Sequence, residues 1–257
     1  NINGVISHII KNIENIIGTS HNDTITGDTG DNTLIGGAGT DTIRGITGNN
    51  YIDGGDDSDI IYAGTGEDKI YAGGGDDTIF TAVGSDTVYG GDGNDKIYGG
   101  LGSKIYGGNY ITASQSHTDS GIDTVDYSQA ITGLTVILGN GNTQGTATSA
   151  DQGSDKLYGI ENITGSNLVK DEITGNSSVN ILSGLVGDDT IYGQAGADTI
   201  YGGADNDELH GGDHSDSIEG GAGNDIIFGD AGNDILKGDA GDDKFVFTYT
   251  AGSNVFD

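Results

Sequence analysis

An aspartate and an aliphatic residue recur together every nine residues through most of this 257-residue chain. In the nonapeptide 36–44, Asp41 stands at the sixth place and Ile43 at the eighth, while glycine fills the first, second and fourth places. Carboxylate oxygens are the ligands that hard cations such as Ca²⁺ prefer. The spacing therefore predicts a cation-binding chemistry that is repeated along the chain.

Two runs keep this nine-residue register, the first over 18–98 and the second over 166–246. A tenth copy of the first run, 99–106, is one residue short and has Lys104 near the place of the aspartate. The sixth places of the first run are Asp23, Asn32, Asp41, Asn50, Asp59, Asp68, Asp77, Asp86 and Asp95. Those of the second run are Asp171, Asn180, Asp189, Asp198, Asp207, Asp216, Asp225, Asp234 and Asp243.

The nonapeptide divides into a turn and a short strand. Glycine at three of the first six places permits positive φ and therefore a tight turn. The last three places are β-prone, and neighbouring side chains of a strand point to opposite faces. One aliphatic residue per strand makes no core alone, so two strands and two turns must close a coil of 18 residues that stacks on the next coil. We therefore predict an all-β fold, a parallel β-roll built as two stacked blocks.

In such a stack, residues 18 apart lie on the same edge, so the sixth-place aspartates form columns. The first run has four Asp–Asp steps on one edge and one on the other, and the second run has four and two, which makes eleven. Neighbouring carboxylates repel unless a cation lies between them. Ca²⁺ accepts six to eight oxygens from carboxylates and turn carbonyls, whereas Mg²⁺ prefers a smaller octahedron. We expect about eleven calcium sites between the turns.

The composition agrees with cations as partners. The chain has 40 acidic and 9 basic residues, a formal net charge of −31, 50 glycines and no proline or cysteine. Nucleic acids and anionic membranes bind clusters of Lys and Arg. The acidic composition therefore argues against both as partners of this chain. No apolar run is long enough to span a bilayer. The regular aliphatic positions argue against disorder, and a period of nine excludes collagen.

Over 18–106 and 166–246, the nonapeptides resemble the calcium-binding β-helix repeats of RTX proteins. Segments 123–127 and 160–162 also resemble stretches that accompany RTX arrays. The resemblance implies a right-handed parallel β-roll, with Ca²⁺ held by the sixth-place aspartates and by carbonyls of the second and fourth places. Glycines at those carbonyl places include Gly37, Gly39, Gly91, Gly93, Gly221 and Gly223. The family also implies type I secretion from a Gram-negative bacterium, with folding by calcium outside the cell.

Some positions depart from the family pattern. Sixth places are filled by asparagine at Asn32, Asn50 and Asn180. Fourth places lack glycine at His21, Asp57, Val169, Ser178, Asp205 and His214. We expect sites that involve these residues to be weaker or distorted. His210 and His214 are four residues apart, but a strand end and a turn do not give them the geometry of a helical zinc pair.

Five parts of the chain are expected from these patterns. They are a leading, capping segment (1–17), a first block (18–108), a connector (109–164), a second block (165–247) and a truncated tail (248–257). Val125, Tyr127, Leu134, Val136 and Leu138 alternate as in two short strands of the connector, and a degenerate repeat surrounds Asp155. We expect the chain to be a monomeric module of a larger protein.

Aromatic residues at ninth places should point outward as two ladders, one on each sheet. They are Tyr62, Tyr71, Phe80, Tyr89, Tyr98 and Tyr106. Two interpretations are open: the rings stack and stabilise the strands, or they form a platform that binds a host glycan or surface partner.

Three functions fit the sequence. The first is a non-enzymatic module of a secreted or cell-surface toxin or adhesin that folds on calcium after export. The second is an adhesive module that uses the aromatic ladders or the connector. The third is the non-catalytic tail of a secreted protease or lipase. No nucleophile, histidine and acid stand together in the sequence as a catalytic set.

Overall fold

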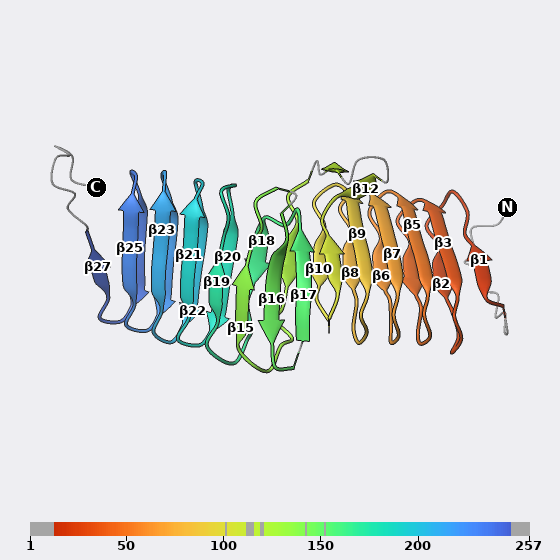
Figure 1. The fold of residues 1–257 in the computed structure, drawn as a ribbon, viewed down its shortest axis with the longest axis horizontal. Coiled ribbons are helices and arrows are strands. Elements are labelled where there is room, and N and C mark those ends of the chain that lie inside the picture. The colour runs from red at the N-terminus through yellow and green to blue at the C-terminus, as the bar shows by residue number, and fades with distance from the viewer. Residues whose placement is uncertain are drawn as a thin grey trace.

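The computed structural model describes residues 13–100, 102–111, 116–118, 121–141, 143–151 and 153–247. Residues 1–12 of the expected leading segment and the expected tail, 248–257, lie outside these ranges. The described residues form an elongated stack of coils, with β1 (Asn15–Ile17) at one end and β27 (Lys244–Val246) at the other (Figure 1). They contain strands and turns but no helix, and so none that could span a membrane. The predicted all-β class is confirmed.

The described strands form two long sheets and one hairpin. The first sheet has fourteen strands in the order β1, β3 (Thr33–Ala38), β5 (Tyr51–Asp56), β7 (Lys69–Gly74), β9 (Thr87–Asp92), β11 (Lys104–Tyr106), β17 (Gly153–Tyr158), β16 (Gly145–Ser149), β15 (Leu134–Ile137), β19 (Glu172–Thr174), β21 (Thr190–Ala195), β23 (Glu208–Asp213), β25 (Ile226–Ala231) and β27. The second has eleven: β2 (Thr24–Thr26), β4 (Thr42–Arg44), β6 (Ile60–Tyr62), β8 (Thr78–Phe80), β10 (Lys96–Tyr98), β14 (Thr124–Asp126), β18 (Asn162–Thr164), β20 (Ile181–Val186), β22 (Thr199–Ala204), β24 (Ser217–Ala222) and β26 (Ile235–Ala240). The hairpin is β12 (Asn109–Ile111) with β13 (Ser116–Thr118).

Strands in the repeat runs pair in parallel with the strand 18 residues further on. Ile52 of β5 lies opposite Ile70 of β7, and Ile61 of β6 lies opposite Ile79 of β8. Consecutive strands therefore alternate between the two sheets, and the predicted 18-residue coil is confirmed. These four eighth-place side chains are fully buried, and they belong to one continuous core cluster. The eighth-place side chains thus pack between the two sheets, except Phe245 in the last coil, which is exposed.

The connector contributes strands to both sheets. β14 and β18 continue the second sheet in parallel between β10 and β20. In the first sheet β17 pairs in parallel with β11, while β16 lies antiparallel between β17 and β15. Val125, Val136 and Leu157 belong to the same core cluster as the repeats. The hydrophobic core therefore continues from the first block through the connector into the second.

Candidate metal sites

The sixth-place side chains lie in the turns, directly before the strands, and all are buried except the half-buried Asp23, Asp234 and Asp243. Asp41, for example, precedes β4 and has no exposed surface. In each of the eleven expected Asp–Asp steps, the backbone N–H of one aspartate donates to Oδ1 of the aspartate 18 residues later, over 2.7–3.0 Å. The predicted columns are therefore present, and hydrogen bonds to the backbone link their members.

The second carboxylate oxygen, Oδ2, points toward the first residue of its own turn. A Cβ on Gly36 would overlap both Asp41 Oδ2 and the carbonyl oxygen of Gly54 in the next coil. Among the described residues, Oδ2 is buried without a hydrogen-bond partner in Asp41, Asp59, Asp68, Asp77, Asp86, Asp189, Asp198, Asp207, Asp216 and Asp225. A charged oxygen in such a place is costly unless a cation or a donor accompanies it.

Burial raises the pKa of these carboxyl groups. The pKa is raised from 3.8 to about 8 for Asp77 and Asp207, chiefly by desolvation. The same cause raises the pKa to about 7 for Asp59, Asp86 and Asp189, although a backbone hydrogen bond to each opposes the shift. Neighbouring carboxylates raise the values further. At neutral pH the buried columns are thus poised to take up either protons or cations.

Backbone carbonyls of the turns point along the stack, toward the next coil. A Cβ on Gly66 would overlap the carbonyl oxygen of Gly48, and a Cβ on Gly221 would overlap that of Gly203. These pairs occupy fourth and second places, respectively. In the described part of the chain, no three acidic, histidine or cysteine side chains converge on one point. An ion held here would therefore take most of its ligands from carbonyls, which is chemistry that suits Ca²⁺.

The six glycines singled out at second and fourth places adopt a left-handed backbone. Gly37, Gly39, Gly91, Gly93, Gly221 and Gly223 have φ between 101° and 149°. Several fourth places without glycine share this conformation, with φ of 72° at Asp57, 78° at Asp205 and 84° at His214. The turn shape is therefore kept at these positions, although a non-glycine residue there costs of order 1 kcal/mol or more.

Asparagine at the sixth place changes the polar contacts of its turn. Asn50 Oδ1 accepts from the N–H of Asn32 (3.0 Å), as an aspartate would. Its Nδ2 donates to the carbonyl oxygens of Thr47 (3.5 Å) and Gly48 (3.2 Å). Asn180 Nδ2 likewise donates to the carbonyl oxygen of Glu161 (2.7 Å). The amide thus supplies N–H donors to the turn carbonyls, which an aspartate cannot do.

One member of the columns was missed by counting nonapeptides. Asp123 in the connector is fully buried, and its Oδ1 accepts from the N–H of Asp95 (2.7 Å). A Cβ on Gly107 would overlap Asp123 Oδ2 and the carbonyl oxygen of Gly159, the same arrangement as in the repeats. The spacing here is 28 residues rather than 18 because of the insertion that contains β12 and β13. Its local sequence, Asp-Thr-Val, matches that at Asp86 and was the available signal.

The column that contains Asp68 and Asp86 continues into the connector through Ser103 and Asp155. Ser103, rather than the expected Lys104, stands at the sixth place of the short tenth copy, because Lys104 pairs with the seventh-place Thr87. Ser103 N–H donates to Asp155 Oδ1 (2.7 Å), and the buried Tyr127 hydroxyl donates to Asp155 Oδ2 (2.9 Å). Both oxygens of this buried carboxylate therefore have a donor.

The outward aromatic residues form two ladders, as predicted. Tyr62, Phe80 and Tyr98 stack on the second sheet, with centroids 4.7 and 4.4 Å apart. On the first sheet the stack runs through Tyr71, Tyr89, Tyr106 and Tyr158, at 4.6–4.8 Å. The rings are within 11° of parallel, so their faces are turned to one another. This geometry favours the stabilising interpretation over a platform that offers ring faces to a sugar.

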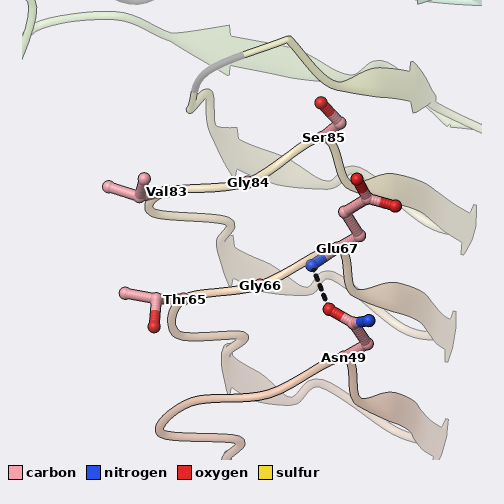
Figure 2. Close-up of a pocket in the computed structure, with 7 residues that line it drawn as sticks. All are labelled: Asn49, Thr65, Gly66, Glu67, Val83, Gly84 and Ser85. Carbon is pink, nitrogen blue, oxygen red and sulfur yellow. Dashed lines mark hydrogen bonds between the residues drawn. The ribbon is translucent and has the colours of Figure 1, made fainter.

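A shallow groove follows the turns on one edge of the first block, with a volume of about 550 Å³ (Figure 2). Third-place and fifth-place side chains form its two sides, and fourth-place glycines form its floor. The lining residues are Asn49, Thr65, Gly66, Glu67, Val83, Gly84 and Ser85. Along the fifth-place side, the N–H of Glu67 donates to Asn49 Oδ1 (2.8 Å). A fifth-place side chain is thus hydrogen-bonded to the backbone of the next coil.

Comparison with known proteins gives one family. The chain matches the RTX calcium-binding nonapeptide repeat, HemolysinCabind, over residues 17–52, 44–79, 71–103, 174–209 and 210–245. These segments cover more than half of the chain and coincide with the two runs of buried aspartates. No curated protein matches the chain.

Proposed function

Because the chain belongs to the family of RTX calcium-binding nonapeptide repeats, we propose that it is a module whose folding is driven by calcium after export from a bacterial cell. The observation that carries this proposal is the set of buried Oδ2 atoms without partners, which face turn carbonyls. Calcium there would neutralise the carboxylates and join neighbouring turns. Extracellular calcium sites have Kd values of about 10⁻⁴–10⁻³ M, so they fill outside a cell and empty inside it.

We assign one calcium to each of the eleven Asp–Asp steps, held by sixth-place carboxylates and by carbonyls of the second and fourth places. The step from Asp95 to Asp123 has the same geometry and adds a further site. The step from Asn32 to Asn50 should be weak or empty, because its amide already donates to the turn carbonyls.

For the parent protein we propose a large secreted or surface-bound toxin or adhesin of a Gram-negative bacterium, exported by a type I system. Family membership and the acidic, cysteine-free composition support this. The module itself is assigned no enzymatic activity, and it would act as a monomeric unit with two blocks joined by the connector. A non-catalytic tail of a secreted protease or lipase remains the alternative parent. An adhesive role through the ladders has less support, because the stacked rings cover one another's faces.

Isothermal titration calorimetry with calcium tests the site assignment. Asp77 belongs to two steps, so Asp77→Asn should bind one or two fewer ions than the unaltered protein. Asp56→Asn is the matched control, because Asp56 is an exposed third-place residue and the charge change is the same. The assignment fails if the unaltered protein binds no calcium, or if both variants lose the same number of ions.

A further inference from the structure

Fifth-place side chains form a second ladder in the turns, which runs opposite to the aspartate columns. In each case a side-chain oxygen accepts from the N–H of the fifth-place residue in the next coil. The acceptors, with distances of 2.7–3.2 Å, are Asn22, Asp31, Asn49, Ser58, Asp76, Asn94, Asp188, Asn206 and Asn224. The RTX nonapeptide pattern leaves this place unspecified.

The peptide group explains why this ladder matters for the carbonyls. The fifth-place N–H and the fourth-place C=O belong to one planar trans peptide, so they point in opposite directions. Asn224 N–H donates backward to Asn206 Oδ1 (2.8 Å). The carbonyl of Gly223 must then point forward, and a Cβ on Gly241 in the next coil would indeed overlap it.

The same relation is visible in the groove of the first block. Glu67 N–H donates to Asn49 Oδ1 in the coil before it (Figure 2). The carbonyl oxygen of Gly66, in the same peptide group, lies against Gly84 in the coil after it. Two independent positions in different blocks thus couple a fifth-place acceptor to a forward-pointing fourth-place carbonyl.

We propose that the fifth-place Asn, Asp and Ser side chains are positioning residues, which orient the fourth-place carbonyl toward the calcium site without contacting the ion. This inference rests on the proposed function, because it concerns the carbonyl assigned there as a calcium ligand. Sites with a fifth-place acceptor should bind calcium more tightly than sites without one, even when both have the same number of aspartates. Thr40 and Val179 are fifth-place residues that, within the described chain, accept no N–H from the next coil, so they serve as controls.

The test compares four alanine substitutions with matched controls. Asn22→Ala, Asn49→Ala, Ser58→Ala and Asn206→Ala are combined in one variant, which leaves the charge and every aspartate unchanged. Thr40→Ala with Val179→Ala is the control. Replacing the three asparagines by serine keeps an oxygen acceptor, as Ser58 does at 3.0 Å. Calcium affinity is measured by calorimetry. The number of water molecules on bound Tb³⁺ is measured from luminescence decay in H₂O and D₂O.

We expect calcium to bind about tenfold more weakly at four sites of the alanine variant, since loss of an outer partner typically costs 10- to 100-fold in metal affinity. Water on Tb³⁺ should increase, because a misdirected carbonyl leaves a ligand position open. The control should match the unaltered protein, and the serine variant should recover most of the affinity. The single variants Asn206→Ala and Val179→Ala repeat the comparison at one site if the fourfold variant does not fold.

Two results would overturn the inference. One is calcium affinity in the alanine variant equal to that of the control. The other is a weaker affinity with an unchanged number of waters on Tb³⁺, which would make the ladder a purely structural support. Failure of the proposed function is seen separately, in the unaltered protein, as an absence of calcium binding.

Discussion

Asp155, a buried carboxylate of the connector, has other partners than the buried carboxylates of the repeat blocks. Asp77 in the first block and Asp207 in the second each accept one backbone N–H at Oδ1, while Oδ2 is buried without a hydrogen-bond partner. Asp155 in the connector is as buried, yet it has a donor at each oxygen, from Ser103 N–H and Tyr127 Oη. At the same position in the coil, Oδ2 therefore has a side-chain donor in Asp155, whereas it has no donor in Asp77 and Asp207.

We expect the dependence on calcium to be set separately in each turn, by the donors that its carboxylate finds. The segments that match the RTX family end at residue 103 and resume at 174, so the connector lies where the match is interrupted. At Asp155 the neutral hydroxyl of Tyr127 supplies the donor to Oδ2 that the aspartates of the blocks lack. We therefore expect the turn of Asp155 to need little calcium, in contrast to the turns of the two blocks and to the step from Asp95 to Asp123.

The largest expected effect is that of pH on the stability of the calcium-free protein. The pKa is raised from 3.8 to about 6 for Asp198 and Asp216 and to about 8 for Asp77 and Asp207. Between pH 3.8 and about 8 the folded state therefore binds more protons than the unfolded one. Stability without calcium is then fully present below pH 3.8 and lost as the pH rises through about 8. Calcium-free protein should show more β-structure by circular dichroism at pH 5.5 than at pH 8. A signal independent of pH would contradict the burial of these carboxylates.

A smaller effect is expected from Tyr127→Phe, which removes the donor to Asp155 Oδ2 and leaves that oxygen unsatisfied. The variant should lose about 1–3 kcal/mol of stability in urea unfolding at saturating calcium. The number of bound calcium ions should not change, in contrast to Asp77→Asn. Tyr158→Phe is the control, because the bond of Tyr158 to Gln144 is exposed. Equal losses in the two variants would remove the distinction between connector and blocks.

The smallest expected effect is on the outer ladder. Phe80→Leu removes stacking on Tyr62 and Tyr98 and should cost about 1 kcal/mol in urea unfolding. Tyr201→Leu should cost less, because Tyr201 is an exposed ninth-place aromatic residue flanked by Ser183 and Glu219 rather than by rings. If Tyr201→Leu costs as much as Phe80→Leu, ring stacking contributes nothing to the stability of the blocks.

The features of the fold that depend on the nine-residue period could be predicted from the sequence. The eighth-place aliphatic residues predicted the core, and the 18-residue coil placed Asp41 and Asp59 in one column. The columns could not be followed into the connector by counting residues, because insertions change the spacing. Asp123 follows Asp95 by 28 residues, and Asp155 lies 52 residues beyond Ser103. The bond from Tyr127 to Asp155 depends on how β17 stacks on β11, which no local pattern reveals. The fifth-place ladder was not predicted, because Asn, Asp and Ser all serve as its acceptors and no single residue type recurs there.

The most direct test of the central claim is a calcium titration of the whole chain, followed by circular dichroism. We predict that the chain is largely disordered in chelator at pH 8 and gains β-structure cooperatively as calcium reaches about 10⁻⁴–10⁻³ M. Magnesium at the same concentrations should not substitute, because it prefers a smaller octahedral site. A full β signal and a sharp thermal transition in chelator would show that calcium is not required for folding, and would contradict the account.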